Sequence, residues 1–356
     1  MLMSRSLHYM PRLDGLRAIA VTGVLVEHWI PLKAIGALST GGAGVTLFFV
    51  LSGYLITRIL TDYRDYSVTS AAASFYWRRL LRLSPPFYAA ILVGVVFDVL
   101  LMRDHWWINA LYLTNFEIGL SGAWTDGADH FWSLCVEEQF YLIWFFVIVV
   151  LPRGFIAPAI CLALLTTLLF RSYVYVEHLP PLTTVLLPGN LASLAIGSLL
   201  AHANQAPRLR WFAQVALERT TLVVTAVIFL LVSLSLPFLR WPSALFYPYV
   251  ASAFSVCLVA TAAANRHRLF SWLALPPLVH IGRISYGIFV YHLFVPPLLG
   301  RIPATAWAVQ ASWKSFALCS VVTLVVSQLS WLLFERPILR FKDQVAPRPK
   351  AISLAA

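Results

Sequence analysis

Residues 131–151 read FWSLCVEEQFYLIWFFVIVVL. About 20 consecutive apolar residues are enough for a helix to cross the hydrocarbon core of a bilayer. This stretch has that length, and only the adjacent carboxylates Glu137 and Glu138 carry charge within it. It therefore predicts a transmembrane helix that brings two acidic side chains into or near the membrane.

Further runs of roughly 17–25 mostly apolar residues occur along the whole chain. They are residues 16–35, 43–60, 85–101, 154–171, 183–202, 221–239, 245–264, 283–300 and 315–335. The sequence therefore predicts an all-α integral membrane protein with about ten transmembrane helices. We expect one transmembrane domain over residues 1–345, a short disordered tail over 346–356, and no appended soluble domain.

The composition supports this fold class. The 356 residues are 60% hydrophobic and only 12% charged, whereas a soluble protein averages about 45–50% apolar and about 25% charged residues. No soluble fold buries so much apolar surface, so the surplus must face lipid. The four cysteines stand singly in apolar runs, and we expect no metal site.

The net charge of +11 would suggest a nucleic-acid partner in a soluble protein. In a membrane protein, Lys and Arg gather in cytoplasmic loops. With the N-terminus in the cytoplasm, 20 of the 26 Lys and Arg residues fall on the inner side. The distribution predicts cytoplasmic N- and C-termini, and we expect no nucleic-acid partner.

Arg17 and His28 lie in the first apolar run, although an ionisable residue inside lipid costs at least about 2.5–3.5 kcal/mol. Eleven residues make about three helical turns plus 20°, so both side chains face one way, roughly 16 Å apart. We expect Arg17 at the cytoplasmic edge and His28 near the membrane midplane. A neutral imidazole there is a candidate general base; the alternative is a hydrogen bond between helices.

A second group is the arginine cluster of residues 75–86, FYWRRLLRLSPP. Arg79 and Arg82 stand at i,i+3 spacing and converge on one ligand if the segment is helical. Guanidinium groups bind phosphates in a bidentate manner, although anchoring to anionic lipid headgroups is the commoner explanation for this motif taken alone. We expect an amphipathic helix at the cytoplasmic face that ends at Pro85-Pro86.

A third group is on the helix that contains Glu137. Ser133, Glu137 and Tyr141 lie on one face at i,i+4 spacing, with Glu138 adjacent. Intramembrane carboxylates suggest a hydrated cavity, here open to the outer side. The alternative is that Glu137 and Glu138 cap backbone amides of the outer loop 102–130, where we expect a short interfacial helix.

Two further segments carry polar residues at similar depth. Residues 281–295, IGRISYGIFVYHLFV, place His292 near the midplane, and Ser52 in FFVLSGYLI lies beside Gly53, which permits close helix packing.

The last motif is FERP, residues 334–337. We expect Pro337 to end the final helix and Arg336 to lie at the cytoplasmic face. Glu335 is expected either to pair with an arginine of the 79–82 cluster or to brace Arg17.

Taken together and in this order, these segments resemble the acyltransferase-3 family, the membrane O-acyltransferases that modify bacterial surface sugars, Nod factors and macrolides. The motifs that carry the resemblance are LDGLRAIAV with His28, FFVLSGYLIT, FYWRRLLRLSPP, FWSLCVEEQFYLIW, ISYGIFVYH and FERP. The resemblance implies a multi-pass protein of the bacterial inner membrane. It also implies transfer of an acyl group from acyl-CoA, usually acetyl-CoA, to a hydroxyl group, with no tightly bound cofactor.

The resemblance also assigns expected roles. It implies CoA binding by Arg17, Arg79, Arg82 and Arg336, and catalysis by His28 with Glu137 and His292. The supporting residues are Ser52, Glu138, Tyr141, Tyr291 and Glu335. We expect the arginines at the cytoplasmic side, the carboxylates towards the outside and the histidines between them. His28 then either deprotonates the acceptor or carries the acyl group transiently.

Several alternatives stay open at this point. The acceptor is expected to be a surface polysaccharide or lipopolysaccharide, and a macrolide or another small hydroxylated molecule is the second choice. A transporter or flippase of lipid-linked sugars would also need intramembrane charges, but the sequence has no internal repeat of the transporter type. A structural partner in glycan assembly is the third hypothesis.

Overall fold

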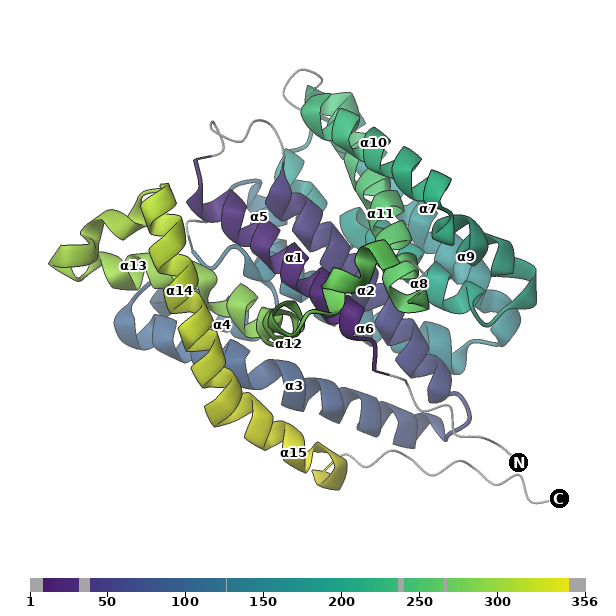
Figure 1. Cartoon of the computed structure of the whole chain (residues 1–356), viewed down its shortest axis with the longest axis horizontal. Coiled ribbons are helices and arrows are strands. Elements are labelled where there is room, and N and C mark those ends of the chain that lie inside the picture. Colours follow the sequence, from purple (N-terminus) through teal and green to yellow (C-terminus); the bar gives the residue numbers. More distant parts are fainter. Residues whose placement is uncertain (1–8, 32–38, 126, 236–239, 266–267, 346–356) are drawn as a thin grey trace.

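The computed structural model describes residues 9–31, 39–125, 127–235, 240–265 and 268–345. Every regular element in these ranges is helical (Figure 1), which confirms the all-α class. The expected tail over residues 346–356 lies outside the described residues. So do residues 32–38 and 236–239, where two of the expected spans end.

Fifteen α-helices form the described part of the chain. They are α1 (Pro11–Trp29), α2 (Thr40–Asp62), α3 (Val68–Phe97), α4 (Met102–Ala110), α5 (Thr114–Ser121), α6 (Phe131–Phe145), α7 (Ile156–Val176), α8 (Leu187–Ala203), α9 (Arg210–Leu217), α10 (Arg219–Ser235), α11 (Arg240–Ala264), α12 (Pro276–Tyr291), α13 (Val295–Gly300), α14 (Trp313–Ser330) and α15 (Arg336–Val345). Short 3₁₀ and π segments extend several of them, among them π turns over Phe146–Val150 and Trp331–Glu335.

Within the described ranges, eight helical segments are long and apolar enough to cross a membrane. The pair α9–α10, bent by 65°, makes a ninth if it counts as one span. Helix α1 is not among them, because it carries Arg12, Asp14, Arg17 and Glu27 within 19 residues. Helices α2, α11, α12 and α14 contact it instead (Figure 1), so neighbouring helices cover the charged helix.

Two expected helix ends were wrong. Helix α3 does not end at Pro85-Pro86 but continues through both prolines to Phe97. Helix α15 likewise runs past Pro337, which stands at its second position, directly after the π turn that contains Glu335. A proline is tolerated in membrane helices where local 3₁₀ or π adjustments and neighbouring groups satisfy the freed carbonyl groups.

Helices α1 and α12 lie against each other and run in the same direction. A Cβ atom built on Gly282 of α12 would lie 1.9 Å from the carbonyl oxygen of Asp14 in α1, so only glycine permits this approach. At the other end of both helices, the rings of His28 and His292 lie 4.9 Å apart. Each helix therefore carries an arginine near its middle or first half, Arg17 in α1 and Arg283 in α12, and a histidine at its C-terminal end.

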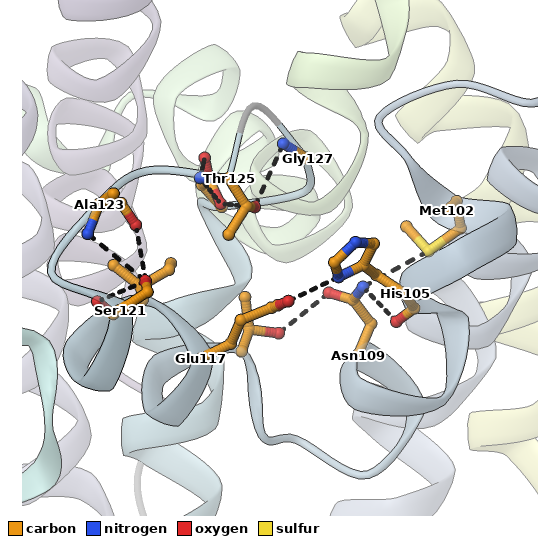
Figure 2. A network of polar contacts seen from close by, with 11 residues as sticks. Met102, His105, Asn109, Glu117, Ser121, Ala123, Thr125 and Gly127 are labelled. Carbon is orange, nitrogen blue, oxygen red and sulfur yellow. Dashed lines mark hydrogen bonds and ion pairs between the residues drawn. The ribbon is translucent and has the colours of Figure 1, made fainter.

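The segment between α3 and α6 contains two short helices, α4 and α5, where we expected one. Figure 2 shows how polar contacts connect them: His105 Nδ1 lies 2.5 Å from Glu117 Oε1, and Thr114 donates to Asn109 at 2.9 Å. Farther along, the backbone amide of Thr125 donates to the Asp129 carboxylate just before α6 begins. These contacts fix the chain leading to His130, the residue that precedes α6.

The contact between α2 and α8 gives a direct test of this packing. A Cβ atom on Gly53 would lie 1.9 Å from the carbonyl oxygen of Leu194, so Gly53→Ala must push the two helices apart. We expect it to lower the free energy of unfolding by about 1–3 kcal/mol, the usual range for overpacking. The measurement is thermal unfolding in detergent. Gly154→Ala is the matched control, because a Cβ there meets nothing within 4 Å, and equal losses in both variants would contradict the packing argument.

Candidate active site

A cavity of about 750 Å³ lies between α1, α2, α3, α6 and α12. We call it the arginine cavity, because its polar wall contains Arg17, Arg79, Arg82 and Arg283. The rest of the lining is largely apolar, with Phe48, Leu51, Leu55, Leu134 and Phe289 among its residues. The volume includes space open to solvent. The four guanidinium groups favour an anionic ligand.

Three of the four arginines that we expected to act together line this cavity. Arg17, Arg79 and Arg82 come from two helices and meet at this one wall. Arg336 is instead exposed at the start of α15 and is not part of the cavity lining, so the structure does not bring it together with the other three arginines. The π turn before α15 decides this, because it changes the direction in which residues of the last helix point.

Arg283 takes the fourth place, and the sequence analysis missed it. The signal was present, since Arg283 precedes His292 by nine residues on α12 much as Arg17 precedes His28 by eleven on α1. The charge was instead assigned to a cytoplasmic loop by the positive-inside rule. Only the parallel contact of α1 with α12 brings the two arginines to one wall.

Asp14 and Tyr9 hold two of the arginines in place. Arg17 Nη1 donates to Asp14 Oδ1 at 3.2 Å, and the Tyr9 hydroxyl donates to Asp14 Oδ2 at 2.7 Å. Arg283 Nη2 in turn donates to the Tyr9 oxygen at 2.9 Å. Partial burial and the hydrogen bond to Asp14 raise the pKa of Tyr9, so its hydroxyl remains a donor at neutral pH.

Glu137, Tyr141 and Ser52 form a hydrogen-bonded chain inside the arginine cavity. Tyr141 donates to Glu137 Oε2 at 2.9 Å, so Ser52, whose Oγ is 2.5 Å from the Tyr141 oxygen, must be the donor to Tyr141. The guanidinium of Arg79 lies over the Tyr141 ring, 4.4 Å from its centroid. The Arg79 guanidinium, the Tyr141 ring and the Glu137 carboxylate are therefore connected by direct contacts.

This arrangement corrects the expected order of charges. Glu137 opens into the same cavity as the arginines, and not into a separate cavity on the outer side. Along α6, His130 precedes Glu137 by seven residues, a rise of about 10 Å. The carboxylate therefore lies between the arginines and the histidines. Glu138 is half-buried and does not line the cavity.

Three histidines meet at the other end of these helices. The ring of His292 lies 4.9 Å from that of His28 and 4.9 Å from that of His130. His28 stands in the last turn of α1, His130 directly before α6, and His292 directly after α12. His28 is thus at a helix end and not in the middle of its helix, where the expected span 16–35 had put it. The sequence analysis missed His130, although it opens the quoted segment 130–144.

Hydrogen bonds fix the tautomer of each ring, because a carbonyl oxygen only accepts. Nδ1 of His28 donates to Val24 O at 2.9 Å, which leaves its Nε2 as an acceptor. Nδ1 of His292 donates to Phe289 O at 2.6 Å, and Nε2 of His130 donates to Val290 O at 3.1 Å. The remaining nitrogens of His292 and His130 are buried and have no hydrogen-bond partner among the described residues.

His28 is exposed to a second cavity of about 480 Å³, which we call the histidine pocket. Its other lining residues are Trp29, Leu100, Leu293, Pro296 and residues 308–311. No residue lines both cavities among those that the structure describes. An exposed imidazole with a free Nε2 beside an apolar wall can accept a proton from a bound hydroxyl.

Tyr291 and Glu335 form a separate network behind the arginine cavity. The Tyr291 hydroxyl lies 2.9 Å from Ser330 Oγ, which donates to Glu335 Oε1 at 3.0 Å. Glu335 is buried in the π turn and interacts electrostatically with Arg82. Arg82 belongs to the 79–82 cluster, and both expected roles of Glu335 stay predictions. Tyr291 and Glu335 support the cavity from outside its lining.

The comparisons with known proteins agree with this constellation. The model of an acyltransferase domain matches residues 10–332, almost the whole chain. The chain belongs to the acyltransferase-3 family. This confirms the resemblance seen in the six motifs, and it identifies a family of acyl-transferring membrane enzymes.

The family's curated members include similar proteins. A putative peptidoglycan O-acetyltransferase of Bacillus subtilis is 30% identical over 93% of this chain and 55% of its own length. The peptidoglycan O-acetyltransferase of Listeria monocytogenes is 28% identical over 93% of this chain and 56% of its own length. The chain thus spans little more than half the length of these relatives. No solved structure matches it significantly.

The arginine cavity predicts binding of a phosphorylated anion. Inorganic pyrophosphate should raise the unfolding temperature of the detergent-solubilised protein, and Arg79→Ala and Arg82→Ala should each weaken binding about tenfold, because hydrogen bonds to charged groups contribute about 1.5–3 kcal/mol. The measurement is a thermal-shift titration. Arg340→Ala, at an exposed position on α15 outside the cavity, is the control and should leave binding unchanged. Unchanged binding in Arg79→Ala and Arg82→Ala would contradict the assignment.

Proposed function

We propose that this protein is a multi-pass O-acyltransferase of the bacterial inner membrane. It moves an acetyl group from acetyl-CoA on the cytoplasmic side to a hydroxyl group of a glycan. The observation that carries the proposal is the pairing of two sites on the same helices. Four arginines gather at one end, and an imidazole with a free Nε2 lies at the other.

The arginine cavity is the proposed binding site for the donor. CoA carries several phosphate groups, and guanidinium groups bind phosphate oxygens in pairs. Arg79 and Arg82 hold these phosphates, Arg17 and Arg283 line the mouth, and the apolar wall accepts the uncharged arm and acyl group. The charge distribution along the sequence supports a cytoplasmic location of this end, which is where CoA is found.

His28 is the proposed general base. Its Nε2 removes the proton from the acceptor hydroxyl, and the hydroxyl oxygen attacks the thioester carbon. The bond from carbon to sulfur then breaks, and the imidazolium returns the proton to the departing CoA thiolate, so that an ester and free CoA result. Glu137, in reach of Arg79 and Tyr141, stabilises the cationic side chains around the donor. His292 orients His28 through its ring contact.

The acceptor is proposed to be a glycan on the outer side. Two relatives are named for peptidoglycan O-acetylation, so peptidoglycan fragments are the first acceptors to test, followed by lipopolysaccharide and other surface polysaccharides. A macrolide or another small hydroxylated molecule remains the second candidate for the same chemistry. A flippase of lipid-linked sugars is the alternative from another class, and it would release no thiol from acetyl-CoA.

The first test of the reaction is thiol release from acetyl-CoA by purified protein, with and without peptidoglycan fragments. We expect acceptor-dependent release by the wild type and a fall of about 10²–10⁴-fold in His28→Ala, the usual contribution of a general base. His280→Ala is the matched control, because His280 is an exposed histidine of α12 that is bonded to Gln328 and lines neither cavity. An active and folded His28→Ala protein would overturn the assignment of the base.

The donor site has its own kinetic signature. In the double variant Arg79→Ala/Arg82→Ala, the KM for acetyl-CoA should rise at least about tenfold, because charge-assisted hydrogen bonds are lost. The KM for the acceptor should change little. Steady-state kinetics with each substrate varied in turn measures both values. A rise in the KM for the acceptor alone would contradict the assignment of the CoA site to these arginines.

A further inference from the structure

The proposed base and the proposed donor site lie in two separate cavities. His28 lines the histidine pocket, and the arginines line the arginine cavity, with no shared lining residue among those described. From Arg17 to His28 the rise along α1 is about 16 Å, and from Arg283 to His292 along α12 it is about 13 Å. Something must therefore separate a thioester held at one end from the base at the other.

Phe289 occupies that position on α12. Its ring lines the arginine cavity on one side. On the other side it lies 5.8 Å from the ring of His130 and 5.5 Å from the ring of His292. Phe289 is only 6% exposed, and Phe48, another residue of the cavity wall, packs on it at 6.3 Å. One side chain thus contacts both the cavity and the histidines.

The groups behind Phe289 are polar and only partly satisfied. His292 Nε2 and His130 Nδ1 are buried without a hydrogen-bond partner among the described residues, and such atoms are rare in folded proteins. Ser133, which also lines the arginine cavity, donates to the His130 carbonyl oxygen at 3.3 Å. Ser133 thus brings a polar group of the arginine cavity next to His130, and the Phe289 ring lies beside the same histidines.

We propose that Phe289 is the partition between a donor cavity and an acceptor pocket, and that its ring must turn aside for the acyl group to be transferred. This rests on the proposed function in so far as the arginine cavity holds the donor and the histidine pocket the acceptor. In the closed position the ring keeps water away from the thioester. If water enters in place of the acceptor, its oxygen attacks the thioester carbon, and acetate and free CoA result without an ester.

The barrier itself can be tested without any catalysis. In a Cys161→Ser background, which removes the exposed native thiol, His28→Cys is treated with a membrane-impermeant thiol reagent applied to either face of sealed vesicles. We expect labelling from one face only, the face to which the histidine pocket opens. Adding Phe289→Ala should allow labelling from both faces, with at least a tenfold rise in rate from the second face.

Phe294→Ala is the matched control for this experiment. Phe294 is also a buried aromatic residue beside His130, at 6.2 Å, but it does not line the arginine cavity. It should leave labelling restricted to one face. Labelling from both faces with Phe289 present, or from one face in Phe289→Ala, would overturn the partition.

The second measurement is coupling, with His28 restored. Phe289→Ala should raise thiol release from acetyl-CoA without acceptor at least tenfold and lower the number of esters formed per CoA released, whereas Phe289→Leu should retain most of the coupling. One ester per CoA in Phe289→Ala would overturn the proposal. If the wild type forms no ester with any acceptor, the proposed function fails instead, and the labelling result still decides whether Phe289 is the barrier.

Discussion

The structure depends on one constraint: a helix with four charged residues must be kept away from lipid. Helix α1 carries these four residues. It also contains Arg17 at one end of the proposed site and His28 at the other. It is enclosed by α2, α11, α12 and α14, and the approach of α12 is possible because Gly282 has no side chain to meet the Asp14 carbonyl group. An unshielded charge in hydrocarbon costs several kcal/mol, so packing and function are served by the same contacts.

That enclosure gives the site its two ends. Because α1 and α12 run in the same direction, their arginines share one cavity and their histidines share one cluster. Helix α6 runs the opposite way along the same cavity, with His130 before its first turn and Glu137 and Tyr141 farther along. The arginine end and the histidine end lie about 16 Å apart along α1, a spacing that suits the proposed donor and acceptor on opposite faces of a membrane.

The histidine cluster contains imidazole nitrogens that are paired on one side of each ring only. Each imidazole donates to a backbone carbonyl group, which fixes its tautomer. Two of the second nitrogens remain without a partner among the described residues. Unpaired buried nitrogens are unfavourable, and their presence next to Phe289 is explained if they become paired when the partition opens.

The sequence by itself determined the all-α membrane class, the family, and most of the polar side chains that line the arginine cavity, because apolar run length and helical spacing are local properties. It could not determine which residues from distant helices share a wall. Arg283 and His130 were missed and Arg336 was grouped with the cavity arginines, since their positions depend on the direction of α12 against α1 and on a π turn before α15. Those features are set by contacts between helices, such as Gly282 against Asp14, and such contacts exist only in the folded protein.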